Sequence, residues 1–109
     1  MINDRFTAAA IRIHKDLPVV DGHNDLPWAI RTKARGSLEE ANPGQHLAGY
    51  HTDIPRLLTG GVGAQYWSVY VPPWSERPLR DTLEQIDLVT HMAAANPEHL
   101  VMATSADQV

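Results

Sequence analysis

A short apolar run that ends in polar residues constrains the fold of this chain more than any other feature. Residues 18–25 read PVVDGHND, in which two valines beside proline and glycine indicate a strand. Side chains of an extended strand alternate between its faces, so His23 and Asp25 should point the same way while Asn24 points to the other face. An imidazole nitrogen and a carboxylate oxygen on one face suit zinc and similar divalent metals. The segment therefore predicts half of a metal site.

Asp25 also has a structural interpretation. An aspartate that follows a strand commonly caps a turn or a helix, with its side-chain oxygen accepting a backbone N–H. In contrast, a polar cluster at the carboxyl end of a buried strand, here Val19 and Val20, is typical of the functional face of a parallel barrel. These residues alone leave both interpretations open, and two ligands do not complete a catalytic metal centre.

The rest of the chain alternates helical and extended patterns. Apolar residues spaced by three and four predict a helix from Phe6 to Leu17 that Pro18 closes. The polar stretch 31–49 predicts a long loop beside the metal ligands, which either covers a substrate or is a solvated excursion. Residues 62–71 predict a second strand and residues 100–103 the start of a third. This order predicts an α/β fold with a parallel sheet.

A long helix is predicted from Pro78 to the Asn96-Pro97 pair. Its core-facing stripe is predicted from the helical wheel to consist of Leu79, Leu83, Ile86, Val89 and Ala93. Leu88 lies outside this stripe. Asp87 and His91 are four residues apart on the polar face, and we interpret them as an exposed ion pair in preference to a metal site.

A second His-x-Asp motif, His51-Thr52-Asp53, competes with the first. Pro55 follows it and suits the first turn of a short helix that two glycines would end. Thr52 or Asp53 is therefore predicted to cap that helix, and the motif is not predicted to bind metal.

Charge and composition exclude several classes of function. The chain has 9 basic and 13 acidic residues, a formal net charge of −4 and no basic cluster, which argues against a nucleic-acid partner. It has no cysteine, so any zinc must be held by histidine and carboxylate. Its apolar segments are too short for a membrane span or a secretory leader, and a cytoplasmic location is therefore expected.

Three segments in order resemble a known family. They are Val20–Trp28 (VDGHNDLPW), Thr52–Leu57 (TDIPRL) and Gly60–Pro72 (GGVGAQYWSVYVP). Together they resemble the start of the membrane (renal-type) dipeptidases, peptidase family M19. The similarity runs from Phe6 to Val109. Because enzymes of that family are several times longer, residues 1–109 are expected to be an N-terminal portion.

The resemblance implies a (β/α)8 barrel of the metal-dependent hydrolase type, of which this chain would supply about two of the eight β/α units. It also implies a zinc-dependent dipeptidase that holds two zinc ions and hydrolyses dipeptides through a metal-activated hydroxide. His23 and Asp25 match the metal ligands of the first strand. The bridging glutamate and the two later histidines of the family match no position of this chain.

An incomplete barrel has consequences for stability and activity. Strands without neighbours leave apolar surface and open edges exposed, so the chain alone is expected to be poorly stable and inactive. The alternative is a truncated, non-catalytic fragment or an interaction module that keeps only a partial metal site. These residues set neither the preferred dipeptide nor the oligomeric state.

Overall fold

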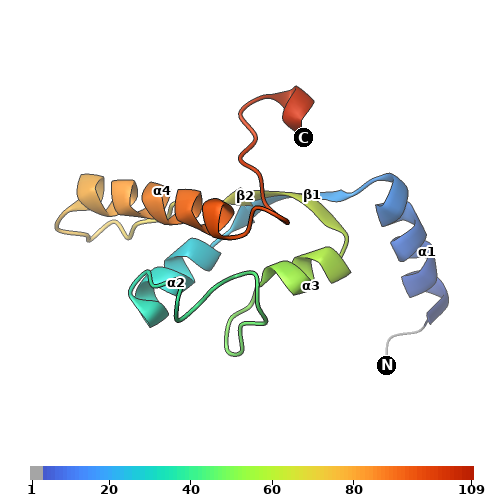
Figure 1. Cartoon of the computed structure of the whole chain (residues 1–109), viewed down its shortest axis with the longest axis horizontal. Coiled ribbons are helices and arrows are strands. Elements are labelled where there is room, and N and C mark those ends of the chain that lie inside the picture. Colours follow the sequence, from blue (N-terminus) through green and yellow to red (C-terminus); the bar gives the residue numbers. More distant parts are fainter. Residues whose placement is uncertain (1–3) are drawn as a thin grey trace.

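A computed structural model describes residues 4–109 and shows helices arranged about a two-stranded parallel sheet (Figure 1). Strand β1 spans Val19–Asn24 and pairs with β2, which spans Val62–Trp67. The helices are α1 (Asp4–Asp16), α2 (Leu26–Ala34), α3 (Ile54–Thr59) and α4 (Pro78–Ala95), followed by the short 3-10 helix η1 (Ala106–Gln108). The predicted α/β class with a parallel sheet agrees with this order.

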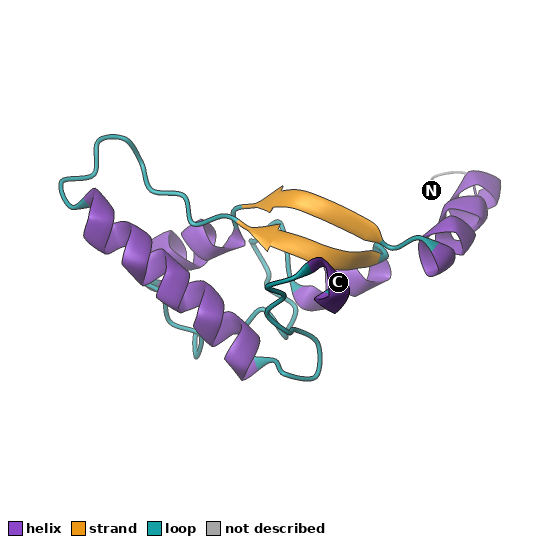
Figure 2. Ribbon diagram, turned by 90° about the horizontal axis from the view of Figure 1, so that it is seen from above, coloured by secondary structure: helices purple, strands orange, loops and turns teal. Residues whose placement is uncertain are grey.

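The sheet brings the carboxyl ends of both strands to one edge. Val19 pairs with Val62 at the start of the ladder and Asn24 pairs with Trp67 at its end, with an irregularity between Asp21 and Asn24. Figure 2 shows the two strands side by side, with α1 at the far end of the molecule. The prediction of a buried Val19-Val20 pair is wrong: Val19 is half-buried and Val20 is exposed, because the sheet of the described residues has two strands.

The hydrophobic core lies between α2, α4 and the loop that follows α2. Its apolar side chains come from all three segments, which explains why a long irregular loop is held in place. The buried members are Leu26, Ile30, Ala34, Ala41, Leu47, Leu88 and Met92. The stretch 31–49 is therefore not a solvated excursion, because Ala41 and Leu47 anchor it in this core.

The sequence prediction of a loop from residue 31 misses α2. Leu26, Ile30 and Ala34 recur at intervals of four and form the buried side of this helix. Pro27 lies in its first turn, where proline is tolerated, and Arg35 ends it in the left-handed conformation at φ 52°. The helix is short and has proline as its second residue, so its signal resembles that of a turn.

Helix α4 has the predicted bounds, but its predicted core-facing stripe is wrong except at Val89, which is buried. Leu79, Leu83 and Ile86 are exposed. The buried face instead consists of Gln85, Leu88, Val89 and Met92, at positions i, i+3, i+4 and i+7. A glutamine at the first of these positions conceals the pattern; its amide donates to the Tyr70 carbonyl at 3.0 Å.

The predicted strand limits also need correction. Strand β2 ends at Trp67 and not at Val71, because the chain leaves the ladder after the Ser68 N–H donates to the Asn24 carbonyl at 2.9 Å. Residues 100–103 form neither helix nor strand, and only Leu100 among them is not exposed. A strand needs a partner for its backbone groups, and this segment joins neither strand of the sheet.

Helix α1 stands apart from the core. It has the predicted amphipathic pattern and ends before Pro18, but none of its residues is buried. Of the helices formed by residues 4–109, none is long and apolar enough to cross a membrane.

Two leucines of α4 test the corrected orientation of this helix. Leu88 is 8% exposed and Leu83 is 57% exposed. Replacing Leu88 with alanine should lower the free energy of unfolding by about 2–5 kcal/mol, the usual cost of a cavity in a core. The matched Leu83→Ala variant should change it by no more than about 0.5 kcal/mol. Equal losses in chemical denaturation would contradict the buried face described above.

Candidate metal centre

The two predicted ligands meet where β1 ends. His23 is the second-last residue of β1, and Asp25 is the first residue after this strand. The Nε2 atom of His23 lies 3.0 Å from the Oδ2 atom of Asp25. Their side chains are 67% and 53% exposed, so solvent and ligands can reach both. The structure thus brings together the two side chains that the sequence singled out.

The backbone of Asp25 explains how the side chains converge. With φ −92° and ψ 21°, this residue departs from extended geometry and lies near the bridge region that active-site residues often occupy. Asp25 precedes the first residue of α2, but its side chain makes no capping hydrogen bond. The interpretation of its carboxylate as a helix cap is therefore wrong.

Ser68 is a third residue of this edge that sequence reasoning missed. The pKa of the Asp25 carboxyl lies below its ordinary value. A hydrogen bond from His23 lowers this pKa most, partial burial raises it, and a hydrogen bond from Ser68 lowers it further. Ser68 directly follows β2. No signal in the sequence marked Ser68 as part of this edge, because the predicted second strand, residues 62–71, includes it.

The donor pair fits a divalent metal in chemistry and in spacing. Two donors that each lie about 2.0–2.1 Å from one tetrahedral ion are about 3.3 Å apart. The 3.0 Å between His23 Nε2 and Asp25 Oδ2 is close to that value. Within residues 4–109, however, no group of three or more His, Cys, Asp or Glu side chains converges on a point where an ion could be held. These residues supply part of a metal centre.

The second His-x-Asp motif has a different environment. Asp53 is fully buried and is the N-cap of α3, as predicted, with its carboxylate accepting the Arg56 N–H at 2.9 Å. The same carboxylate accepts the Leu47 N–H at 2.9 Å and the Arg56 guanidinium at 2.8 Å, and it pairs with His46 at 3.1 Å. Its acceptor capacity is used within the fold, so this motif is structural.

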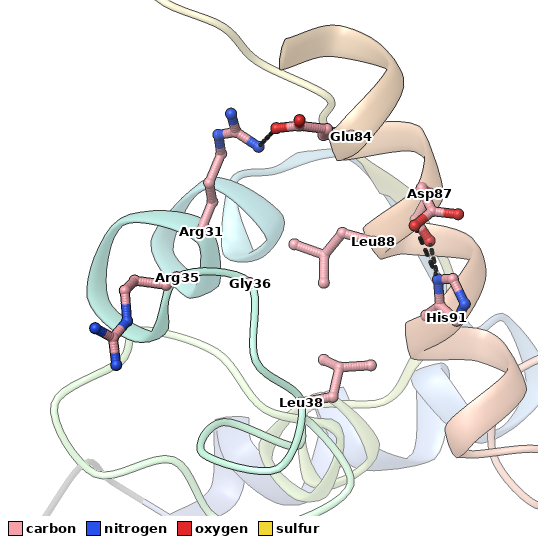
Figure 3. A pocket seen from close by; sticks show the side chains of 8 residues that line it. All are labelled: Arg31, Arg35, Gly36, Leu38, Glu84, Asp87, Leu88 and His91. Carbon is pink, nitrogen blue, oxygen red and sulfur yellow. Dashed lines mark hydrogen bonds and ion pairs between the residues drawn. The ribbon is translucent and has the colours of Figure 1, made fainter. Parts of the chain in front are cut away.

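A pocket of about 420 Å³ between α2 and α4 offers no competing chemistry. Figure 3 shows Leu38 and Leu88 pointing into this space, with the charged side chains at its rim. Arg31 pairs with Glu84 at 2.8 Å, and His91 pairs with Asp87 at 3.2 Å across an exposed helix face, as predicted. The Asp87–His91 contact therefore agrees with the predicted exposed ion pair on the polar face of α4.

The family model for membrane dipeptidases, peptidase family M19, matches residues 7–109, nearly the whole chain. The chain belongs to the membrane dipeptidase family. This membership agrees with the resemblance of the three sequence segments.

Individual relatives agree with the family. Dipeptidase 3 of Rattus norvegicus and dipeptidase 3 of Mus musculus are each 42% identical over 105 residues, which cover 94% of this chain. The dipeptidase ataJ of Aspergillus terreus is 39% identical over 103 residues, which cover 85% of this chain. The matched segment spans 21% of each rodent protein and 25% of the fungal one. The chain thus spans a small part of the dipeptidases that it matches.

The two aspartates of the His-x-Asp motifs allow a matched test. Burial raises the pKa of Asp53, but hydrogen bonds from Leu47 and Arg56 and the charge of Arg56 outweigh it and lower the pKa below its ordinary value. At pH 7, Asp53→Asn should lower the free energy of unfolding by about 1–3 kcal/mol, the cost of unsatisfied buried groups. Asp25→Asn, at an exposed position, should change it by no more than about 0.5 kcal/mol.

The pH dependence of stability follows from the lowered pKa of Asp53. The stabilisation is fully present above the pKa of the unfolded chain, about 3.9, and is lost as pH falls through the lower folded-state value. The difference between the parent chain and Asp53→Asn should therefore shrink as denaturation is measured at pH values below about 4. A difference that grows with acidity would contradict the assigned direction.

Proposed function

We propose that this polypeptide is part of a zinc-dependent enzyme that hydrolyses dipeptides, with His23 Nε2 and Asp25 Oδ2 among the ligands of one metal ion. The observation that carries the proposal is the 3.0 Å donor pair at the carboxyl edge of the β1–β2 sheet. It is supported by membership in the membrane dipeptidase family and by the names of the relatives, each of which is a dipeptidase.

The chemistry required is hydrolysis of an amide. When bound, a divalent zinc ion supplies a Lewis acid that polarises the scissile carbonyl and lowers the pKa of a water molecule. His23 contributes a neutral donor and Asp25 a negative one, and both are open to solvent. Ser68, which contributes to lowering the pKa of the Asp25 carboxyl, lies where an outer contact could orient this ligand.

Proton release should accompany metal binding. In the structure His23 Nε2 and Asp25 Oδ2 are close enough to share one proton. Because metal ligands bind in their deprotonated forms, an ion held by these two atoms would take the place of that proton.

An aromatic contact joins the two segments that follow this edge. The rings of Trp28 and Tyr70 meet at a centroid distance of 5.3 Å and an interplanar angle of 88°. Trp28 lies in the first turn of α2 and Tyr70 in the chain that leaves β2, so the contact connects the segments that follow Asp25 and Ser68. Such an edge-to-face pair stabilises the fold by more than the burial of its apolar area alone.

The 109 residues by themselves supply too few donors for this reaction. Within the described part of the chain, His23 and Asp25 lack a third convergent ligand, and a catalytic zinc site uses about three protein ligands. We propose that residues 1–109 alone are inactive and that the remaining ligands come from the parts of the dipeptidase fold that this chain does not match. The alternative, a non-catalytic fragment with a partial metal site, rests on the same observation.

Asp25→Asn tests the proposal in the product of the complete coding sequence. The change keeps the size of the side chain but removes a negative ligand, so bound zinc and kcat/KM for dipeptides should fall together. The fall should exceed about 100-fold, because outer contacts of metal ligands alone contribute about 10–100-fold. Zinc is measured by plasma mass spectrometry and hydrolysis by the release of free amino acids.

His51→Ala is the control for this experiment. His51 is exposed and belongs to the motif that caps α3, so both readouts should match the parent protein. Normal zinc content and turnover in Asp25→Asn would disprove the metal assignment. Loss of zinc with unchanged turnover would disprove the role of the metal in hydrolysis.

A further inference from the structure

We propose that Asn24 is a positioning residue that holds His23 and Asp25 in their converged geometry. Asn24 lies between the two candidate ligands and is half-buried where they are exposed. The positional claim stands on the contacts of its side chain. Its consequence for metal affinity rests on the function proposed above.

The side chain of Asn24 connects three segments of the chain. Its Oδ1 accepts the N–H of Leu26 at 3.0 Å, at the start of α2. Its Nδ2 donates to Thr52 Oγ1 at 3.2 Å, in the loop before α3, and to Gln65 Oε1 at 3.3 Å, on β2. The amide thus uses its oxygen and both of its N–H groups within the protein.

The bond to Leu26 acts on the backbone of Asp25 directly. A side chain that accepts the N–H two residues ahead forms an Asx-type turn. This turn encloses Asp25 and holds it in its non-extended conformation, at φ −92° and ψ 21°. On the other side of the pair, Asp21 Oδ1 accepts the His23 N–H at 3.1 Å. Two local bonds therefore fix the backbone before His23 and after Asp25.

The bonds to Thr52 and Gln65 fix this turn relative to the rest of the molecule. Gln65 is itself held, because its Nε2 donates to the Asp21 carbonyl at 3.3 Å and to the Tyr66 carbonyl at 3.2 Å. The Asn24 backbone carbonyl also accepts the Ser68 N–H at 2.9 Å. Asn24 thereby sets the position of the turn relative to Ser68, the residue that follows β2.

Packing cannot supply this precision, because the His23 and Asp25 side chains are more than half exposed. Exposed ion pairs contribute little on their own and do not hold long side chains in one geometry. The convergence at 3.0 Å therefore depends on the backbone, and Asn24 is the side chain that ties this backbone to other segments. Since its amide groups are already used, Asn24 acts on the ligands and is not one of them.

Asn24→Ala in the product of the complete coding sequence tests this role. The first readout needs no metal: the nuclear Overhauser effect between the His23 ring and the Asp25 β protons, measured with selectively labelled protein. It should weaken strongly, and the Leu26 amide should lose protection from hydrogen exchange. The second readout is zinc affinity by calorimetry, which should fall about 10–100-fold, as for other outer contacts of metal ligands.

Asn96→Ala is the matched control. Asn96 is buried at the end of α4, and its side-chain amide donates to the Met92 carbonyl at 2.9 Å. The same substitution there should lower the melting temperature. It should leave the His23–Asp25 contact unchanged and zinc affinity within about twofold of the parent value, because the side chains of Asn96 and Asn24 share no hydrogen-bond partner.

Thr52→Val distinguishes positioning from general loss of stability. It removes the hydroxyl that accepts from Asn24 without changing charge or volume, and it should weaken zinc binding by a smaller factor. In the Asn24→Ala background the same change should have no further effect on affinity, because the interaction is already absent. Additive effects of the two substitutions would overturn the proposal.

The outcomes separate the two hypotheses. An unchanged His23–Asp25 contact in Asn24→Ala would overturn the positioning role, whatever happens to zinc. A weakened contact with unchanged zinc affinity would support positioning and count against these two residues as metal ligands. Loss of contact and affinity in Asn96→Ala as well would show a general effect of destabilisation and would also overturn the positioning role.

Discussion

The parallel pairing of β1 with β2 is the interaction on which the candidate site depends. The pairing ends with Asn24 opposite Trp67 and with the Ser68 N–H donating to the Asn24 carbonyl. It therefore places Ser68 beside Asp25, although the two residues lie far apart in the sequence. Parallel strands need a long connection, and here α2, the loop after it and α3 provide both that connection and most of the core.

The two His-x-Asp motifs show that environment, and not spacing, decides what a motif does. Asp53 is enclosed and surrounded by N–H groups, so its charge stabilises a helix start and the loop before it. Asp25 occupies a comparable place before α2, but its side chain accepts no capping N–H, while the neighbouring Asn24 accepts the N–H of Leu26. The carboxylate of Asp25 therefore remains available to His23, Ser68 and a ligand.

Local signals allowed part of this structure to be predicted. Prolines and glycines mark the end of α1, both ends of α3 and the start of α4, and those limits depend on only a few neighbouring residues. The face that α4 buries depends on what packs against it, and the polar Gln85 at its centre hides that face in the sequence. The expected third strand fails for the same reason, because a strand exists only with a partner.

The candidate site also combines residues that local sequence predicts with residues that only the packing of the strands reveals. His23 and Asp25 could be recognised as candidates because both lie in one short motif at a strand end. Ser68 and the contacts of Asn24 could not, because they depend on the register between β1 and β2 and on a loop that precedes α3. Membership in the membrane dipeptidase family supports the class of chemistry, while the geometry identifies the residues that take part.

The central claim is that the carboxyl edge of β1 and β2 holds a metal ion. Anomalous diffraction at the zinc absorption edge, from crystals of the product of the complete coding sequence grown with zinc, tests it most directly. The account predicts an anomalous peak about 2.0–2.2 Å from both His23 Nε2 and Asp25 Oδ2. A zinc peak bound by other residues, with the His23–Asp25 pair intact and free of metal, would contradict it.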